Sequence, residues 1–248
     1  MEGKELKRIV ISEAQLEENL RMAAYLLEKG CQLTLITEDS KITNSFFADL
    51  SAEQQQRCYV ICLDSYTESR VSEATDQLIQ LMAGLDVFIN GLPGTNEAEL
   101  LRSSPDSFGQ EISTDFNKLF LLNREIVRYM VRQKCGNIIF TMLDDILYYA
   151  DYPASPVKNQ GRLSLMKSLA KELTPFNIRV NSLSFGIYDR DFTSAEKKVM
   201  QKRLEICALK PPIPKWQDLL PALDALINPS FQYMTGQKYS AGIGSSNS

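Results

Sequence analysis

Three glutamates, whose charge is wrong for phosphate binding, stand in a turn near the start of the chain. The turn follows the apolar run "RIVIS" (8–12) and reads Ser12-Glu13-Ala14-Gln15-Leu16-Glu17-Glu18-Asn19. A helical pattern, Gly30 and a second apolar run follow, which is the outline of a nucleotide-binding β-α-β unit. Such a unit normally has glycines in this turn, because the backbone must approach a phosphate closely. Here carboxylates stand at the phosphate position.

A second group of reactive side chains lies between residues 144 and 158. Asp144 and Asp145 could form a carboxylate pair, but adjacent residues of a strand point apart, which favours a role in a turn or a helix cap. Tyr152 and Lys158 could act as a proton donor and the ammonium that lowers its pKa. Two prolines stand between them, so no helical face joins them, and aromatic residues of a surface loop are the favoured interpretation.

Several site classes are excluded by composition. The 248 residues contain no histidine, which removes Ser-His-Asp and Cys-His catalysis and the usual general base near neutral pH. The five cysteines lack metal-ligand spacing, so no metal site is expected and buried thiols in a reducing compartment are the simplest interpretation. They are Cys31, Cys58, Cys62, Cys135 and Cys207.

The charge and the apolar runs limit the partners. The net charge of −4 gives no attraction to nucleic acid or to anionic membranes. All apolar runs are too short to span a membrane, and no signal-peptide pattern is present. We therefore expect a cytoplasmic protein that binds neither nucleic acid nor membrane.

Apolar, β-branched runs alternate with helical patterns along the chain. The runs cover 8–12, 32–37, 58–64, 86–91, 137–143, 178–185 and, weakly, 238–242. The helical patterns cover about 16–27, 69–82, 108–132, 161–173, 193–207 and 216–227. Near-continuous apolar runs suit strands buried on both faces of a parallel sheet, and the alternation implies right-handed crossovers. The sequence predicts a doubly wound α/β fold, with a loose tail at about 243–248.

Four later segments together indicate a family. They are "GLDVFINGLPG" (84–94), "KSLAKEL" (167–173), "FNIRVNSLSFGIYDRDFT" (176–193) and "YMTGQKYSAGIG" (233–244). In this order and spacing the chain resembles the short-chain dehydrogenases/reductases from about residue 7 to 244, and is most similar to the 3-oxoacyl-acyl-carrier-protein reductases. The resemblance implies a single Rossmann-like domain over residues 1–248. It also implies a seven-stranded parallel sheet flanked by helices, and dimers or tetramers.

The resemblance places the family's cofactor positions on the turn and on three strand ends. Counted back from Gly30, the turn positions are Ser12, Glu13, Glu17 and Asn19, and the other positions are Asp64, Asn90 and Gly186. The last three keep the family's residue type. The two glutamates would occupy the pyrophosphate space, and a carboxylate about 4 Å from a phosphate costs about 4 kcal/mol near a protein surface. We predict no cofactor, with NAD(P) implied by the resemblance only.

The end of the second run offers one further cofactor contact. Glu38-Asp39 stands where an acid would hold the adenosine ribose, about 20 residues after the turn. Without the turn, we favour the alternative that this pair caps a helix beginning near Ser40.

The family's catalytic positions have also changed. They fall on Asp115, on Leu143 (or Asp144 with a one-residue shift), on Ser155 and on Asn159. Reduction of a carbonyl needs a proton donor, which a tyrosine and a lysine supply in this family, and Ser155 and Asn159 cannot replace them. Tyr152, Lys158 and Asp144 could take over these catalytic roles if the family positions are shifted by a few residues along this chain, which we call the rescue.

We therefore expect a family member that has lost reductase activity and serves as a binding or assembly subunit. The helices near 108–132 and 161–173, which form the family's dimer face, would make a homo-oligomer or a hetero-oligomer with an active paralogue in fatty-acid or polyketide-type metabolism. Lys197-Lys198 and Lys202-Arg203 form a basic face. The resemblance implies an acyl carrier protein as a further candidate partner for it, although a solvated face of an amphipathic helix is the favoured interpretation. Two alternatives stay open. One is a non-redox lyase, isomerase or dehydratase that uses the family's active-site cleft. The other is a divergent NAD(P)-dependent oxidoreductase acting on a carbonyl or acyl thioester.

Overall fold

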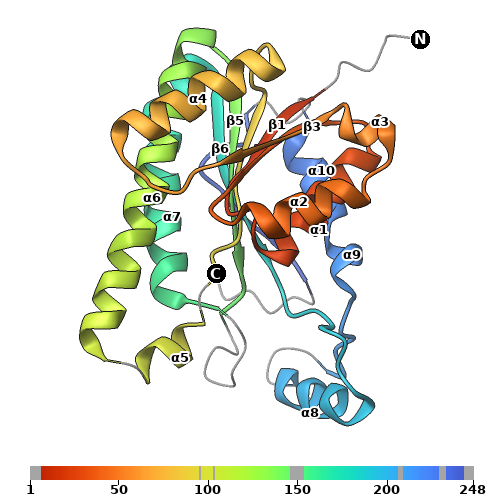
Figure 1. The fold of residues 1–248 in the computed structure, drawn as a ribbon. Coiled ribbons are helices and arrows are strands. Elements are labelled where there is room, and N and C mark those ends of the chain that lie inside the picture. Colours follow the sequence, from red (N-terminus) through yellow and green to blue (C-terminus); the bar gives the residue numbers. More distant parts are fainter. Residues whose placement is uncertain are drawn as a thin grey trace.

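One parallel sheet organises the protein. The structure, a computed structural model, describes residues 7–94, 96–102, 104–145, 154–205, 209–228 and 233–242. Seven strands lie in the order β3-β2-β1-β4-β5-β6-β7, and every neighbouring pair is parallel (Figure 1). The strands are β1 (Arg8–Ile11), β2 (Gln32–Thr37), β3 (Cys58–Cys62), β4 (Val87–Asn90), β5 (Gly136–Leu143), β6 (Ile178–Phe185) and β7 (Lys238–Ala241). The Rossmann-like, doubly wound prediction is confirmed.

Helices cover both faces of the sheet (Figure 1). They are α1 (Glu17–Glu28), α2 (Ser40–Asp49), α3 (Ala52–Gln55), α4 (Glu68–Met82), α5 (Glu97–Leu101), α6 (Pro105–Gln133), α7 (Pro156–Leu173), the 3₁₀ helix η2 (Thr174–Phe176), α8 (Ser194–Leu204), α9 (Trp216–Leu219) and α10 (Pro221–Ile227). One core cluster joins the sheet to α1, α9 and α10, and a second joins it to α4, α6 and α7. Successive side chains of β1 alternate between the clusters, Ile9 and Ile11 in one and Val10 in the other.

Two helix boundaries differ from the sequence prediction. α7 begins at Pro156, five residues earlier than the predicted start at 161, because Ser155 caps it and a proline suits the first helical position. The pattern at 216–227 is two short helices, α9 and α10, since Pro221 lacks the N–H that a continuous helix would use. Asp39 caps α2 through Lys41 N at 2.8 Å, which confirms the preferred reading of that acid.

The expectation of buried cysteines is correct only in part. Cys31 and Cys58 are buried, but Cys62 and Cys135 are exposed, and Cys207 lies outside the described residues. Cys62 ends β3, which lies at the edge of the sheet, and Cys135 stands in the short connection between α6 and β5. No helix within the described ranges combines the length and the apolar character that crossing a membrane requires.

Candidate functional site

The turn after β1 keeps a backbone shape that favours glycine, although it contains none. Glu13 has a φ of 56°, in the left-handed region that costs an L-residue about 1–2 kcal/mol. This is the position of the first turn glycine by family resemblance. The Glu13 side chain is partly buried and accepts a hydrogen bond from Gln15 Nε2 at 2.8 Å. The turn therefore has a left-handed position that favours glycine, and a residue with a carboxylate occupies it.

Asn19 ties this turn to the loop after β4. It is fully buried, and its Nδ2 donates to Glu13 O at 2.8 Å and to Leu92 O at 3.1 Å. Its Oδ1 accepts from Leu92 N at 2.8 Å. A Cβ added at Gly91 would collide with Ser12 O and with the Asn19 amide, so the loop lies directly on the turn. At the third glycine position, the amide has a structural role.

The other acids of the turn point elsewhere. Glu17 is exposed and pairs with Arg21, one helical turn later, at 2.5 Å. That it fills the pyrophosphate space stays a prediction. Glu18, which sequence reasoning missed, accepts from Tyr188 OH at 2.6 Å and lies 3.5 Å from Arg190 Nη2. That contact joins α1 to the segment after β6.

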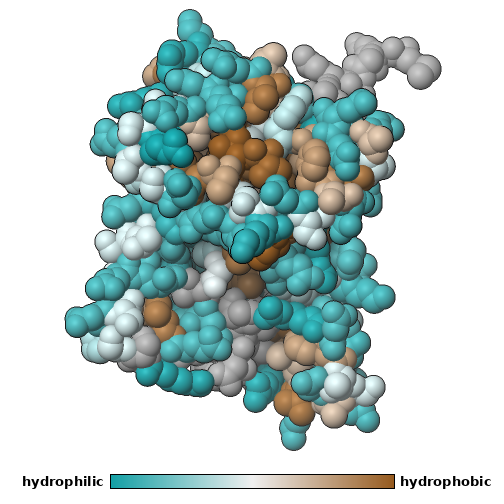
Figure 2. All heavy atoms as spheres, viewed as in Figure 1, coloured by the Kyte–Doolittle hydropathy of each residue, from teal (hydrophilic) through white to brown (hydrophobic). Residues whose placement is uncertain are grey.

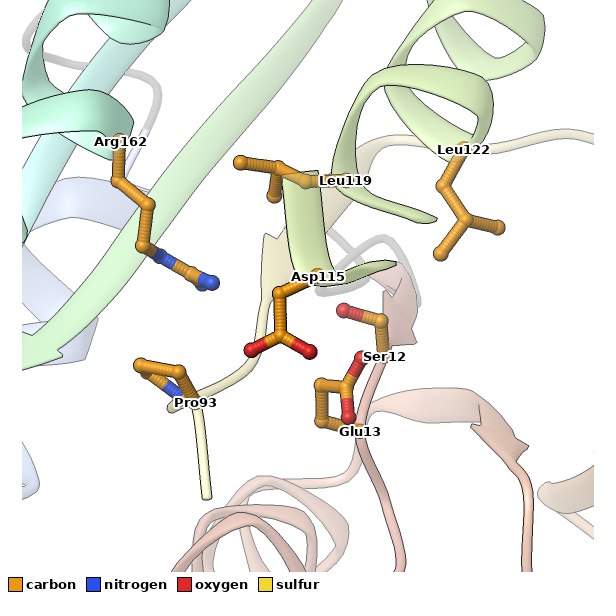
Figure 3. A pocket seen from close by; sticks show the side chains of 7 residues that line it. All are labelled: Ser12, Glu13, Pro93, Asp115, Leu119, Leu122 and Arg162. Atoms are coloured by element: carbon orange, nitrogen blue, oxygen red, sulfur yellow. The ribbon is translucent and has the colours of Figure 1, made fainter. Parts of the chain in front are cut away.

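A small cavity lies between this turn, α6 and α7 (Figure 3). Its volume is about 20 Å³, which is room for about one water molecule. The Arg162 guanidinium and the carboxylates of Asp115 and Glu13 converge on it in Figure 3. The residues that line it are Ser12, Glu13, Pro93, Asp115, Leu119, Leu122 and Arg162.

Arg162 is a buried cation held by carbonyl groups. Its Nη2 donates to Asn90 O at 3.0 Å and to Gly91 O at 2.5 Å, while its buried Nε has no hydrogen-bond partner among the described residues. Burial lowers the pKa of Arg162 to about 10, against the opposing effect of Glu13 and Asp115. Sequence reasoning missed Arg162, although its position in the apolar stripe of α7 beside Leu163 and Met166 was a signal.

Glu13 holds its proton more tightly in this cavity than an ordinary glutamate does. Burial raises its pKa above the ordinary 4.5, and the nearby Glu38 raises it further, while Lys118 and Arg162 act in the opposite direction. Raised carboxyl pKa values in a cleft are typical of general acids, but structural carboxylates show them as well.

An ion pair crosses the cleft where the adenosine half of a dinucleotide would begin. Lys118 of α6 bonds Glu38, after β2, at 2.5 Å, and its ammonium lies 5.4 Å from the centre of the Tyr66 ring. The neighbouring Asp64 is exposed and only 3.6 Å from Arg70, so it faces an open surface pocket. Each of these two acids therefore has a cation of the chain itself beside it, Lys118 at Glu38 and Arg70 at Asp64.

The catalytic positions of the family are used for structure. Ser155 caps α7 and donates to the buried carboxylate of Glu97 at 2.5 Å. Asn159 donates to Leu143 O at 2.8 Å, and so ties α7 to the end of β5. Leu143 is buried and offers no hydroxyl. Glu97 also accepts from Val157 N at 3.0 Å, a role that the sequence did not indicate.

Of the three residues proposed as a rescue, the structure describes Lys158 and Asp144, and both make contacts within the fold. Lys158 is 1% exposed and its ammonium bonds Asp115 and, at 3.2 Å, Glu111. This brings the family position Asp115 together with Lys158, but as an ion pair between α6 and α7. Asp144 donates its backbone N–H to Phe185 O at 2.7 Å. Tyr152 lies outside the described residues.

The positions that keep the family's residue type support the scaffold. The side-chain amides of Asn90 and Asn123 bond each other at 2.7 and 3.2 Å, both buried. A Cβ at Gly186 would lie 3.0 Å from the Cα of Gly242, so close packing of two backbones requires the glycine. Within the described ranges, no group of three or more histidine, cysteine or acidic side chains could hold a metal ion.

Comparison with known proteins gives relatives in one family. Residues 20–246 match the family described as Enoyl-(Acyl carrier protein) reductase. The 3-oxoacyl-acyl-carrier-protein reductase FabG of Thermotoga maritima is 25% identical over 175 residues, which cover 68% of this chain and 69% of that protein. FabG of Aquifex aeolicus is 26% identical over 192 residues, 74% of this chain and 75% of that protein.

Solved structures agree with the fold. A crystal structure of NAD⁺-bound xylitol dehydrogenase has a TM-score of 0.74 at 18% identity, over 96% of this chain and 98% of the other. ElxO with NADP bound has a TM-score of 0.74 at 17% identity, over 97% and 98%. At these identities the likeness shows the shared architecture alone.

Proposed function

This chain belongs to the enoyl-(acyl carrier protein) reductase family of short-chain dehydrogenases/reductases, and from that starting point we propose that it is a member without reductase activity that serves as a binding or assembly subunit. The family is one of oxidoreductases, and the chain resembles its 3-oxoacyl-acyl-carrier-protein reductases. The proposal concerns the chemistry that this chain has lost.

The side chains at the turn carry the proposal, because they do not fit the pyrophosphate of NAD(P). Glu13 adds a carboxylate at the left-handed position where a backbone should approach the phosphate. Asn19 already bonds the turn to Leu92, and the cavity beside them has room for about one water molecule. Carboxylate charge and lost N–H contacts both weaken anion binding at a helix N-terminus.

The occupied catalytic positions support the same proposal. Ser155 and Asn159 are buried and bonded to Glu97 and to Leu143 O, so neither side chain is available to a substrate. Lys158, the nearest ammonium, is bonded to Asp115 and Glu111. A proton donor would have to come from another part of the chain.

The outer surface of α6 and α7 suits an assembly role. Phe120 of α6 is 55% exposed and Val157 of α7 is 41% exposed. Phe116 of α6 packs against Gly161 of α7, where a Cβ would collide with its ring, so the two helices that carry these exposed side chains lie close together. Exposed apolar area of this kind favours a partner, which we propose to be a second copy or an active paralogue.

An acyl carrier protein is a second partner to test. The relatives' names mention it, and α8 presents basic side chains. Lys197 pairs with Asp189 at 2.5 Å, whereas Lys198 and Lys202 are exposed and pair with no acid among the described residues. Two unpaired ammonium groups give an acidic protein an attractive, salt-sensitive contact.

Calorimetric titration with NADH and NADPH tests the proposal. We expect no binding at physiological cofactor concentrations, and a dissociation constant in the low micromolar range for either cofactor would overturn it. The matched variant replaces Glu13, Glu17 and Asn19 by glycine. This variant is expected to gain cofactor affinity and still fail to reduce an acetoacetyl thioester. Turnover by it would reveal a proton donor, with Tyr152 the first to replace.

One observation favours a second candidate, a non-redox enzyme. Glu13 has a raised pKa and faces Asp115 and Arg162 across the small cavity. In hydration of a 2-enoyl thioester, water loses a proton as its oxygen bonds to the β-carbon, and the α-carbon of the resulting enolate takes up a proton. The Glu13 carboxyl, beside the Arg162 guanidinium, could give that proton to the α-carbon and regain one from the water. Hydration that is lost in Glu13→Gln would support this candidate. If the protein does not hydrate a 2-enoyl thioester faster than the uncatalysed reaction, this candidate function is refuted.

A further inference from the structure

The outer edge of β3 lacks the features that usually protect the edge of a sheet. β3 bonds only β2, and no other described segment pairs with its outer side. Its five residues, Cys58-Tyr59-Val60-Ile61-Cys62, include no charge, no proline and no glycine. Natural edge strands normally carry such residues, because unpaired N–H and C=O groups invite another strand.

This edge is also accessible and apolar. Cys62 is exposed, and Tyr59 and Val60 are partly exposed. β3 crosses the front of the molecule in Figure 1, and hydrophobic side chains gather over the same part of the face in Figure 2. The opposite edge strand, β7, is four residues long and begins with an exposed lysine, Lys238.

The direction of the unpaired groups follows from the pairing with β2. Arg57 O accepts from Leu33 N, and Leu63 N donates to Thr37 O, so the odd-numbered residues of this segment face β2. Since bonding direction alternates along a strand, Cys58, Val60 and Cys62 direct their N–H and C=O groups outward.

The strand is complementary to a reversed copy of itself. Read backwards it is Cys-Ile-Val-Tyr-Cys, so antiparallel pairing centred on Val60 places Val60 opposite Val60 and Cys58 opposite Cys62 of the second copy. Every outward N–H then meets an outward C=O, because those same residues form the hydrogen-bonded pairs. The pairing also brings the Arg57 end of one strand beside the Asp64 end of the other.

We propose that β3 is a self-association edge, at which two copies of this chain pair antiparallel about a two-fold axis through Val60 and join their sheets into one continuous sheet. The interface is isologous, since each copy contributes the same strand. It uses a different surface from α6 and α7, and does not depend on whether the protein has lost reductase activity.

Light scattering over a range of protein concentrations tests this proposal on the full chain. Val60→Lys places a charge at the centre of the edge and is expected to halve the mass of the assembly. Val199→Lys, at a 53% exposed site on α8, is the matched control and should leave the mass unchanged. Val157→Lys reports separately on the α6 and α7 surface. An unchanged mass for well-folded Val60→Lys would overturn the proposal.

A crosslinking experiment decides the question if Val60→Lys does not fold. Residues that face each other in a hydrogen-bonded antiparallel pair have Cα atoms about 5.5 Å apart, within the range of a disulfide. Val60→Cys in a Cys62→Ser background is expected to form a disulfide-linked dimer under mild oxidation, and Val199→Cys in the same background is not. Equal crosslinking of the two would show random collision and refute the edge pairing.

Discussion

Replacing Glu13 by glycine should make the protein more stable than replacing it by alanine. Glu13 holds a φ of 56°, which costs an L-residue about 1–2 kcal/mol. Glycine avoids that cost but gives back about 0.5–1 kcal/mol, because it gains more freedom in the unfolded chain. Both variants lose the hydrogen bond from Gln15 and keep the one from Asn19 to the backbone carbonyl. The difference between them therefore isolates the backbone.

The expected difference in the free energy of unfolding is about 1 kcal/mol in favour of Glu13→Gly. In a chain of this size that is a shift of about 2–4 °C in Tm. Scanning calorimetry at pH 7 measures it, with both variants at one protein concentration because association stabilises the folded state. Equal stability, or a more stable Glu13→Ala, would refute the argument from left-handed strain.

Glu13→Gln tests the charge of this side chain. Burial holds the pKa of Glu13 above 4.5, so the folded wild type binds this proton more tightly than the unfolded chain does. The wild type therefore loses stability as pH rises through that raised pKa. Urea titrations between pH 4 and 8 should show Glu13→Gln gaining on the wild type with pH, and a constant difference would contradict this. Asp115→Asn should lower the free energy of unfolding by about 1–3 kcal/mol more than Lys158→Met does. Asp115→Asn removes an anion from the buried ammonium of Lys158, whereas Lys158→Met leaves the Asp115 carboxylate, which is partly exposed and can still contact water. The same titration compares them, and the reverse order would count against the ion pair. Ser155→Ala should lose about 1–3 kcal/mol, through the cap and the hydrogen bond to buried Glu97, and a loss below 0.5 kcal/mol in urea would contradict it.

The fold followed from local patterns in the sequence. The apolar runs at 8–12, 32–37 and 178–185 became buried parallel strands, because residues buried on both faces leave a continuous apolar signature. The helix boundaries were predicted less well where a capping residue sets the start of the helix. Ser155 and Pro156 were read as a catalytic position and a loop, and they are the start of α7.

What the sequence by itself determined about the site is the chemical identity of its key positions: Glu13 and Asn19 where glycines were expected, and Ser155 and Asn159 where a tyrosine and a lysine were expected. These follow from counting along the chain, which needs no coordinates.

Only the tertiary structure decided what those side chains bond. Lys158 met Asp115, a residue 43 positions away. Arg162 reached the carbonyl oxygens at the end of β4, 71 and 72 positions away. A buried polar group must find its partner wherever packing brings one, and that partner depends on how the helices cross the sheet, which no local pattern records.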